Sequence, residues 1–171
     1  MRKVQTESGD RYQCPLSVLW SPHSFQGTRG RHKDRKSQIM EVTTSRKPAP
    51  ALRTFSKDIA FSLGGRYSPR GKAGLGDVIG SGRDVLIVSK SGRDFLIEVY
   101  HDGEPVYDFL FSSFSVTDRE DSILKGLKTG NQIVYDNLNQ YLNVQKTEDS
   151  PDMISFDGVQ RRRYVLRLKI R

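Results

Sequence analysis

The positive charge of this 171-residue chain lies in its first third, and that segregation limits which part can form a hydrophobic core. Residues 1–57 hold 12 Lys and Arg against four acids, whereas residues 58–171 hold 16 of each sign, so the net charge of +8 belongs to residues 1–57. This first segment contains four prolines and shows no sustained helical or strand period. Because it buries too little apolar surface to offset roughly 1–2 kcal/mol of backbone entropy per residue, we expect a largely disordered basic arm. A compact domain is expected over residues 58–171.

The expected domain is rich in strands. Side chains alternate between apolar and polar over residues 58–63, which is typical of a half-buried strand. The sequence Ser-Gly-Arg-Asp occurs at 81–84 and again at 91–94, a spacing that favours consecutive strands of a meander, and Asp102-Gly103 predicts a hairpin turn. Six strands are predicted in all, over residues 58–63, 84–89, 94–100, 105–116, 153–156 and 161–171. Residues 39–42 of the arm are a candidate for one added strand.

Two helices are expected between the fourth and fifth of these strands. Thr117 and Glu120 have the spacing of a capping box, an apolar stripe follows, and Gly130 is a typical stop, so a helix is predicted over 117–130. A second helix is predicted over 131–143. Hairpin-linked strands with grouped helices indicate an α+β domain with a mainly antiparallel sheet.

The last predicted strand places cations on one face and apolar groups on the other, because side chains alternate along a strand. The cationic face carries Arg161, Arg163, Arg167, Lys169 and Arg171. A row of like charges favours an anionic ligand lying over it. The alternative is an edge strand whose charges protect it from aggregation.

Two other groups of cations complete the candidate anion-binding residues. One group is a run in the arm, and the other lies in the glycine-rich stretch 64–83. They are Arg29, Arg31, Lys33, Arg35 and Lys36 in the run, and Arg66, Arg70 and Lys72 in the stretch. Contacts of this kind would bind RNA or DNA phosphates without sequence specificity, and binding would weaken with salt because neutralised phosphates release counterions. The arm run has a second interpretation as a nuclear import signal, and Trp20 either stacks on a base or partner or anchors the arm.

Several stretches of this sequence are close to known enzyme motifs but have the wrong residue spacing. The glycines before Lys72 are one residue too far apart for a phosphate loop, and the glycines of residues 74–80 do not have the dinucleotide spacing. Tyr100 occupies the position where a metal nuclease needs Lys, and the three histidines are scattered. The single cysteine, Cys14, excludes a disulfide within the monomer and a Cys-based zinc site. We therefore expect no enzyme, no cofactor and no metal.

A basic N-terminal arm followed by a strand-rich body resembles the layout of small viral structural proteins of the coat, nucleocapsid or matrix type. The resemblance implies a non-enzymatic protein that binds RNA or DNA, associates with itself and resides in a virion. Two alternatives stay open: a matrix-like peripheral protein on anionic membrane surfaces, and a cellular adaptor or assembly subunit of a ribonucleoprotein. No apolar run reaches the roughly 20 residues of a membrane span, so we expect a soluble or peripheral intracellular protein of the cytoplasm or nucleus.

Overall fold

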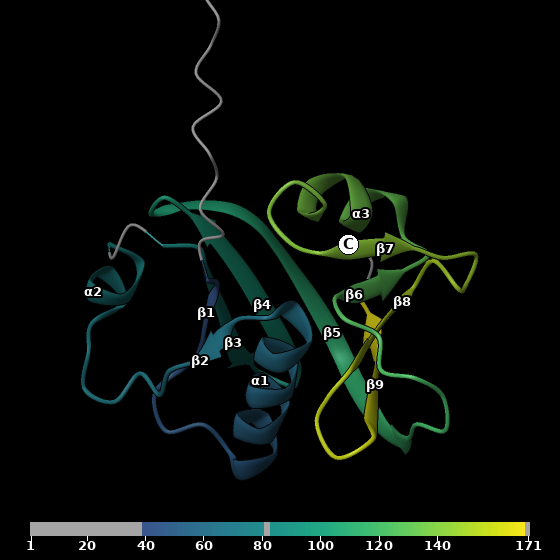
Figure 1. Cartoon of the computed structure of the whole chain (residues 1–171). Helices are drawn as coiled ribbons and strands as arrows, with labels where there is room; N and C mark the ends of the chain where they lie inside the picture. The colour runs from purple at the N-terminus through teal and green to yellow at the C-terminus, as the bar shows by residue number, and fades with distance from the viewer. Residues whose placement is uncertain (1–38, 81–82, 170–171) are drawn as a thin grey trace, which may run out of the picture. The chain divides into compact units, whose positions relative to one another are not determined.

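The computed structural model describes residues 39–80 and 83–169, and Figure 1 shows how their helices and strands are arranged. The elements are β1 (Glu41–Thr44), α1 (Pro50–Leu63), β2 (Arg66–Tyr67), α2 (Leu75–Ile79), β3 (Val85–Ser91), β4 (Asp94–His101), β5 (Glu104–Asp118), β6 (Leu127–Thr129), α3 (Gln132–Leu138), β7 (Val144–Lys146), β8 (Met153–Asp157) and β9 (Arg162–Leu168). The expectations for Trp20, for the arm run and for Arg171 fall outside the described residues.

The strands form one sheet of nine, in the order β2-β1-β3-β4-β5-β9-β8-β6-β7. The α+β class is therefore confirmed, but the sheet has more strands than the predicted six and is mixed. Strand β1 runs parallel to both β2 and β3, and β6 runs parallel to β7, while the central pairs are antiparallel. The predicted placing of the helices is matched in part: α3 lies between the strands expected as fourth and fifth, but α1 and α2 precede β3, and α3 connects β6 to the parallel β7.

The strand predicted over residues 58–63 is wrong, because these residues form the second half of α1. The buried side chains of Leu52, Phe55 and Ile59 follow a spacing of three and four residues, which places them on one face of a helix. Pro50 suits the first turn, and Gly64, with φ of 71°, ends the helix in the left-handed conformation. The predicted boundary between residues 57 and 58 falls inside this helix, and β1 occupies nearly the place expected for an added strand.

The central meander follows the prediction closely. Strands β3, β4 and β5 are consecutive antiparallel neighbours, as the repeated Ser-Gly-Arg-Asp indicates. Asp102 and Gly103, with φ of 50° and 90°, form the turn between β4 and β5. Strands β8 and β9 are also confirmed.

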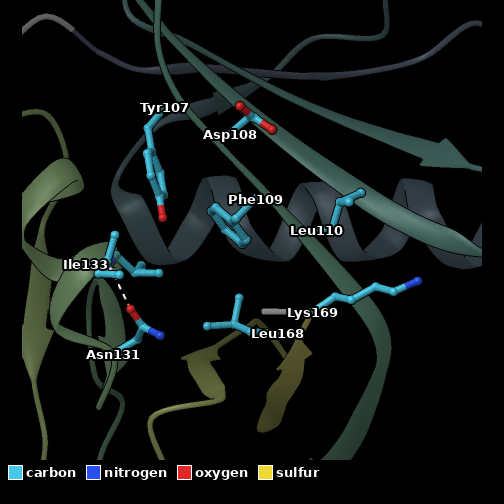
Figure 2. Close-up of a pocket in the computed structure, with 9 residues that line it drawn as sticks. Tyr107, Asp108, Phe109, Leu110, Asn131, Ile133, Leu168 and Lys169 are labelled. Atoms are coloured by element: carbon cyan, nitrogen blue, oxygen red, sulfur yellow. Dashed lines mark hydrogen bonds between the residues drawn. The ribbon is translucent and has the colours of Figure 1, made fainter. Parts of the chain in front are cut away.

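The helix predicted over 117–130 is wrong. Strand β5 runs on to Asp118, which pairs with Arg162 of β9, and the Arg119 N–H then donates to the Arg161 carbonyl over 2.7 Å. Ladder pairing with β9 thus overrides the local capping pattern. Helix α3 is confirmed but is shorter than 131–143. The Asn131 side chain caps it by accepting a hydrogen bond from the Val134 N–H at 3.0 Å, the dashed line at Asn131 in Figure 2.

Helix α1 packs across the sheet through Phe55. The ring of Phe55 lies 5.7 Å from that of Phe111 and 5.5 Å from that of Tyr164, between ring centroids, so the helix contacts β5 and β9 together. Phe114 and Phe156 complete this aromatic group, with centroids 5.0 and 5.3 Å from Phe55. None of the helices in the described ranges is long and apolar enough to cross a membrane.

A buried carboxylate joins the same helix to β9. Asp58 is fully buried, accepts a hydrogen bond from the Tyr164 hydroxyl at 2.6 Å and forms an ion pair with Arg162 Nε at 2.8 Å. Gly158 must be a glycine here, because a Cβ at that position would lie 2.6 Å from Cγ of Asp58. Burial, followed by the hydrogen bond to Asp58, raises the pKa of Tyr164 above its ordinary value.

Candidate nucleic-acid interface

A groove of about 540 Å³ lies where β1 and β2 end and α1 begins. We call it the basic groove. It is lined by Thr44, Ser45, Arg46, Lys47, Pro48, Arg53, Lys57, Tyr67, Pro69, Arg70 and Gly71.

The local topology explains why these side chains meet. β1, α1 and β2 form a β-α-β unit, and the carboxyl ends of its two parallel strands lie at one edge of the sheet. Ligands of open α/β sheets commonly bind outside that edge. Arg53 and Lys57 are four residues apart on α1 and therefore project from the same side of the helix.

The groove is strongly cationic. Its lining contains five Lys and Arg side chains and no acid, and none of the five forms an ion pair with a residue that the structure describes. Between residues 44 and 73 the one acid is Asp58, which is buried against Tyr164 and Arg162 and so does not reach the groove. The groove lining therefore holds five cations that no carboxylate of the described residues neutralises.

The start of α1 adds to this positive field. Ala49 supplies no side-chain cap, and the positive end of the helix dipole lies beside the groove-lining residues 44–48. A helix start of this kind favours phosphate when cations accompany it.

Two arginines of the groove donate hydrogen bonds to carbonyls of the loop that follows β2. Arg46 Nη2 donates to the carbonyls of Lys72 and Ala73 at 3.3 and 3.4 Å, and Arg70 Nε donates to the Ala73 carbonyl at 3.2 Å. The loop after β2 is thereby tied to the loop before α1.

One aromatic side chain lines the groove among the cations. Lys57 Nζ lies 6.0 Å from the ring centroid of Tyr67. The Tyr67 hydroxyl is buried and has no hydrogen-bond partner within the described part of the chain. Buried hydroxyls are nearly always hydrogen-bonded, so this one is an exception; because it is buried, the groove is lined by the ring of Tyr67 and not by its hydroxyl.

Of the three loop cations predicted from the sequence, one lines the groove. Arg70 lines it, and Lys72 is exposed beside it, with its carbonyl bound by Arg46. Arg66 is exposed on β2 but is not part of the lining, since it points to the side of the strand opposite to Tyr67.

Two cations of the face predicted for β9 are neutralised by carboxylates of the protein, and a third is hydrogen-bonded to a carbonyl. Arg163 forms ion pairs with Asp157 and Asp121, each at 2.8 Å. Lys169 Nζ lies 2.6 Å from an Asp94 oxygen, and Arg161 Nε donates to the Arg119 carbonyl. Arg167 is exposed, and no ion pair is found for it within the described ranges. The edge-strand alternative is wrong too, because β9 lies between β5 and β8.

Asp157 is the centre of this neutralised surface. Burial alone would raise its pKa, but hydrogen bonds from Arg163 and the Leu124 N–H, with the charges of Arg163 and Arg119, hold the pKa below its ordinary value. The hydrogen bond to Asp157 in turn raises the pKa of Arg163. These groups stabilise the fold rather than present charge to a ligand.

Sequence reasoning missed Arg46, Lys47, Arg53 and Lys57 as site residues. The prediction places all four in the largely disordered arm of residues 1–57. The signal was present, because Pro50, the apolar spacing of Leu52 and its successors, and Gly64 together are typical of a helix with Arg53 and Lys57 on its exposed side.

No family model matches this sequence. A protein of Archaeoglobus fulgidus described as a probable Brix domain-containing ribosomal biogenesis protein is 31% identical over 90 residues, which is 50% of this chain. The match covers 59% of that relative's own length, so it spans less than two thirds of the relative.

Two solved structures resemble the fold. One is Mil, an archaeal Imp4-like protein, with a TM-score of 0.53 and 21% identity over 77% of this chain and 97% of that one. The other is a probable ribosomal biogenesis protein from Aeropyrum pernix, with a TM-score of 0.51 and 18% identity over 78% of this chain and 96% of that one.

These findings correct the viral interpretation drawn from the layout. The similar proteins are archaeal ribosomal biogenesis and Imp4-like proteins, so the coat, nucleocapsid and matrix resemblance and the virion location are wrong. Nothing in the matches supports a membrane surface as partner, or self-association. The chain shares its fold with Mil and with the Aeropyrum pernix protein.

Proposed function

We propose that this protein binds RNA through the basic groove and acts in the assembly of a ribonucleoprotein, the ribosome being the foremost candidate. The observation that carries the proposal is the set of five groove cations without an ion-pair partner among the described residues. The partial match to a ribosomal biogenesis protein and the fold shared with an Imp4-like protein support this choice of partner. The role is that of an intracellular binding protein and needs no catalytic step.

Phosphate groups explain how such a groove binds RNA. Each phosphate that a Lys or Arg neutralises releases condensed counterions, which gives salt-dependent affinity without reading the bases. The cations of residues 29–36 would add contacts of the same kind in the full chain.

The test is a charge reversal within the groove. We expect Arg53→Glu combined with Lys57→Glu to weaken RNA binding by the full chain at least ~10-fold at about 0.1 M salt, because two phosphate contacts are lost and repulsion replaces them. Binding is followed by fluorescence anisotropy of a labelled RNA. Circular dichroism checks that the variant is folded.

A matched control changes the same charge elsewhere. Lys90, near the end of β3, and Arg93, in the turn to β4, are exposed and do not line the groove, so Lys90→Glu with Arg93→Glu should weaken binding much less. Equal losses from the two double variants would refute the groove as the RNA site, and unchanged binding in the groove variant would refute the proposal itself.

A further inference from the structure

We infer that the basic groove receives one unpaired nucleotide, so that this protein prefers single-stranded RNA to a duplex. The inference rests on the proposed function and specifies the RNA that the same site takes. It follows from the size of the groove, the position of Tyr67 and the arrangement of charge around that ring.

The size of the groove fits a nucleotide. A volume of about 540 Å³ lies within the range of about 300–1,000 Å³ typical of small-molecule sites. A duplex keeps its bases stacked inside and would touch only the rim, whereas single-stranded RNA can turn a base outward against an aromatic ring.

Tyr67 supplies the aromatic ring that a base would contact. The ring lines the groove, whereas the hydroxyl is buried and lies out of a bound ligand's reach. A base turned outward from single-stranded RNA would stack on that ring, which a phosphate bound at the rim would not do.

Charge and ring lie within the span of one nucleotide. Lys57 Nζ is 6.0 Å from the Tyr67 ring centroid, and both side chains line the groove with Arg53 and Arg70. A cation beside an aromatic platform is the arrangement with which proteins hold single strands, the cation taking the backbone and the ring taking the base.

The test compares two RNAs of the same sequence, one single-stranded and one annealed to its complement, at one salt concentration and with the full chain. We expect the wild-type protein to bind the single strand ~10-fold or more tightly. Tyr67→Leu should lower single-strand affinity about 10-fold and leave duplex affinity unchanged. Tyr67→Phe keeps the ring and should retain most of the single-strand affinity.

The control is Tyr135→Leu, which removes a half-buried tyrosine of α3 outside the groove lining and should leave the preference intact. Because Tyr67→Leu could unfold the chain, a second measurement uses the wild-type protein: single-stranded RNA carrying 4-thiouridine should crosslink within residues 44–71. Crosslinks confined to other segments would overturn the inference.

The outcomes separate this inference from the proposed function. If the charge reversal at Arg53 and Lys57 weakens the binding of both RNAs while Tyr67→Leu binds them as the wild type does, the groove binds RNA and the single-nucleotide inference is wrong. Equal loss for single strand and duplex in Tyr67→Leu also overturns it. If the charge reversal changes neither affinity, the proposed function fails and the inference fails with it.

Discussion

Asp157 and Arg163 show what decides whether a charged residue faces a ligand or the protein. Arg163 lies in a strand that the alternating pattern predicts correctly, whereas Asp157 ends β8 one residue beyond the strand predicted over 153–156. The Asp157 carboxylate is buried and takes the Arg163 guanidinium as its partner. No acid lines the basic groove, and Asp58, the one acid between residues 44 and 73, is buried toward the core. The position of the acids thus distinguishes the two groups of cations, and a single sequence does not reveal which cation an acid from another strand will meet.

Lowering the pH should reduce the free energy of unfolding through protonation of Asp157. Its pKa is lower in the folded protein than in the unfolded chain, so its stabilisation is present above the unfolded pKa of about 3.9 and is lost as the pH falls toward the folded value. We expect the wild-type protein to lose more stability between pH 6 and pH 3 than Asp157→Asn does. Urea denaturation at several pH values measures the difference.

The control for this effect is Glu148→Gln, an exposed acid. Its stability should fall with pH as the wild-type stability does. A parallel decline for Asp157→Asn and wild type would contradict the role given to Asp157.

At the scale of elements, β9 and α1 show where sequence patterns succeed and fail. Residues 161–169 alternate so regularly that a strand, and the side of it facing the core, could be predicted. Apolar and polar side chains alternate over residues 58–63 as well, but this stretch covers only about one and a half helical turns. The spacing of three and four residues between apolar side chains becomes visible when the sequence is read from Pro50 onward. The order of the sheet, with β1 parallel to β3 and β9 beside β5, depends on long-range pairing that no local pattern contains.

Two arginines of β9 should therefore behave differently when truncated. Arg163→Ala leaves the buried Asp157 without its main partner and should lower the free energy of unfolding by about 2 kcal/mol, with little effect on RNA affinity when the folded fractions are equal. Arg167→Ala, on the same face but exposed, should change stability by less than about 0.5 kcal/mol. Chemical denaturation compares the two, and equal destabilisation would contradict the assignment.

At the scale of the whole molecule, the net positive charge does lie in the first third of the chain, but part of that segment is folded and lines the groove. The expected arm was assigned all residues up to 57, whereas residues 41–57 supply β1 and the first half of α1, and with them four of the five groove cations. The low apolar content of that stretch misled the prediction, because β1 and α1 bury their few apolar groups against strands that come later in the chain. The α+β class and five of the strands could be predicted, and the groove could not.

Salt dependence should report the number of phosphates that the groove holds. For single strands the slope of log affinity against log salt is about −0.7 per neutralised phosphate, so removing two contacts with Arg53→Gln and Lys57→Gln should make the slope of the full chain shallower by roughly 1.4. Lys90→Gln with Arg93→Gln should leave the slope as it is in the wild type. A slope that is unchanged in the groove variant would show that these two residues contact no phosphate.

The bond between Asp58 and β9 bears on how mutational surveys of this protein should be interpreted. Lys57 lines the groove, while the next residue is held by Tyr164 and Arg162 on a strand more than a hundred positions later. A lesion at Gly158 or Tyr164 would loosen that turn of α1 and register as a binding defect, although neither residue is in the groove lining. Screens for variants that lose the proposed RNA binding should therefore recover remote positions, which must be separated from true contacts by correcting each affinity for the fraction of protein that is folded.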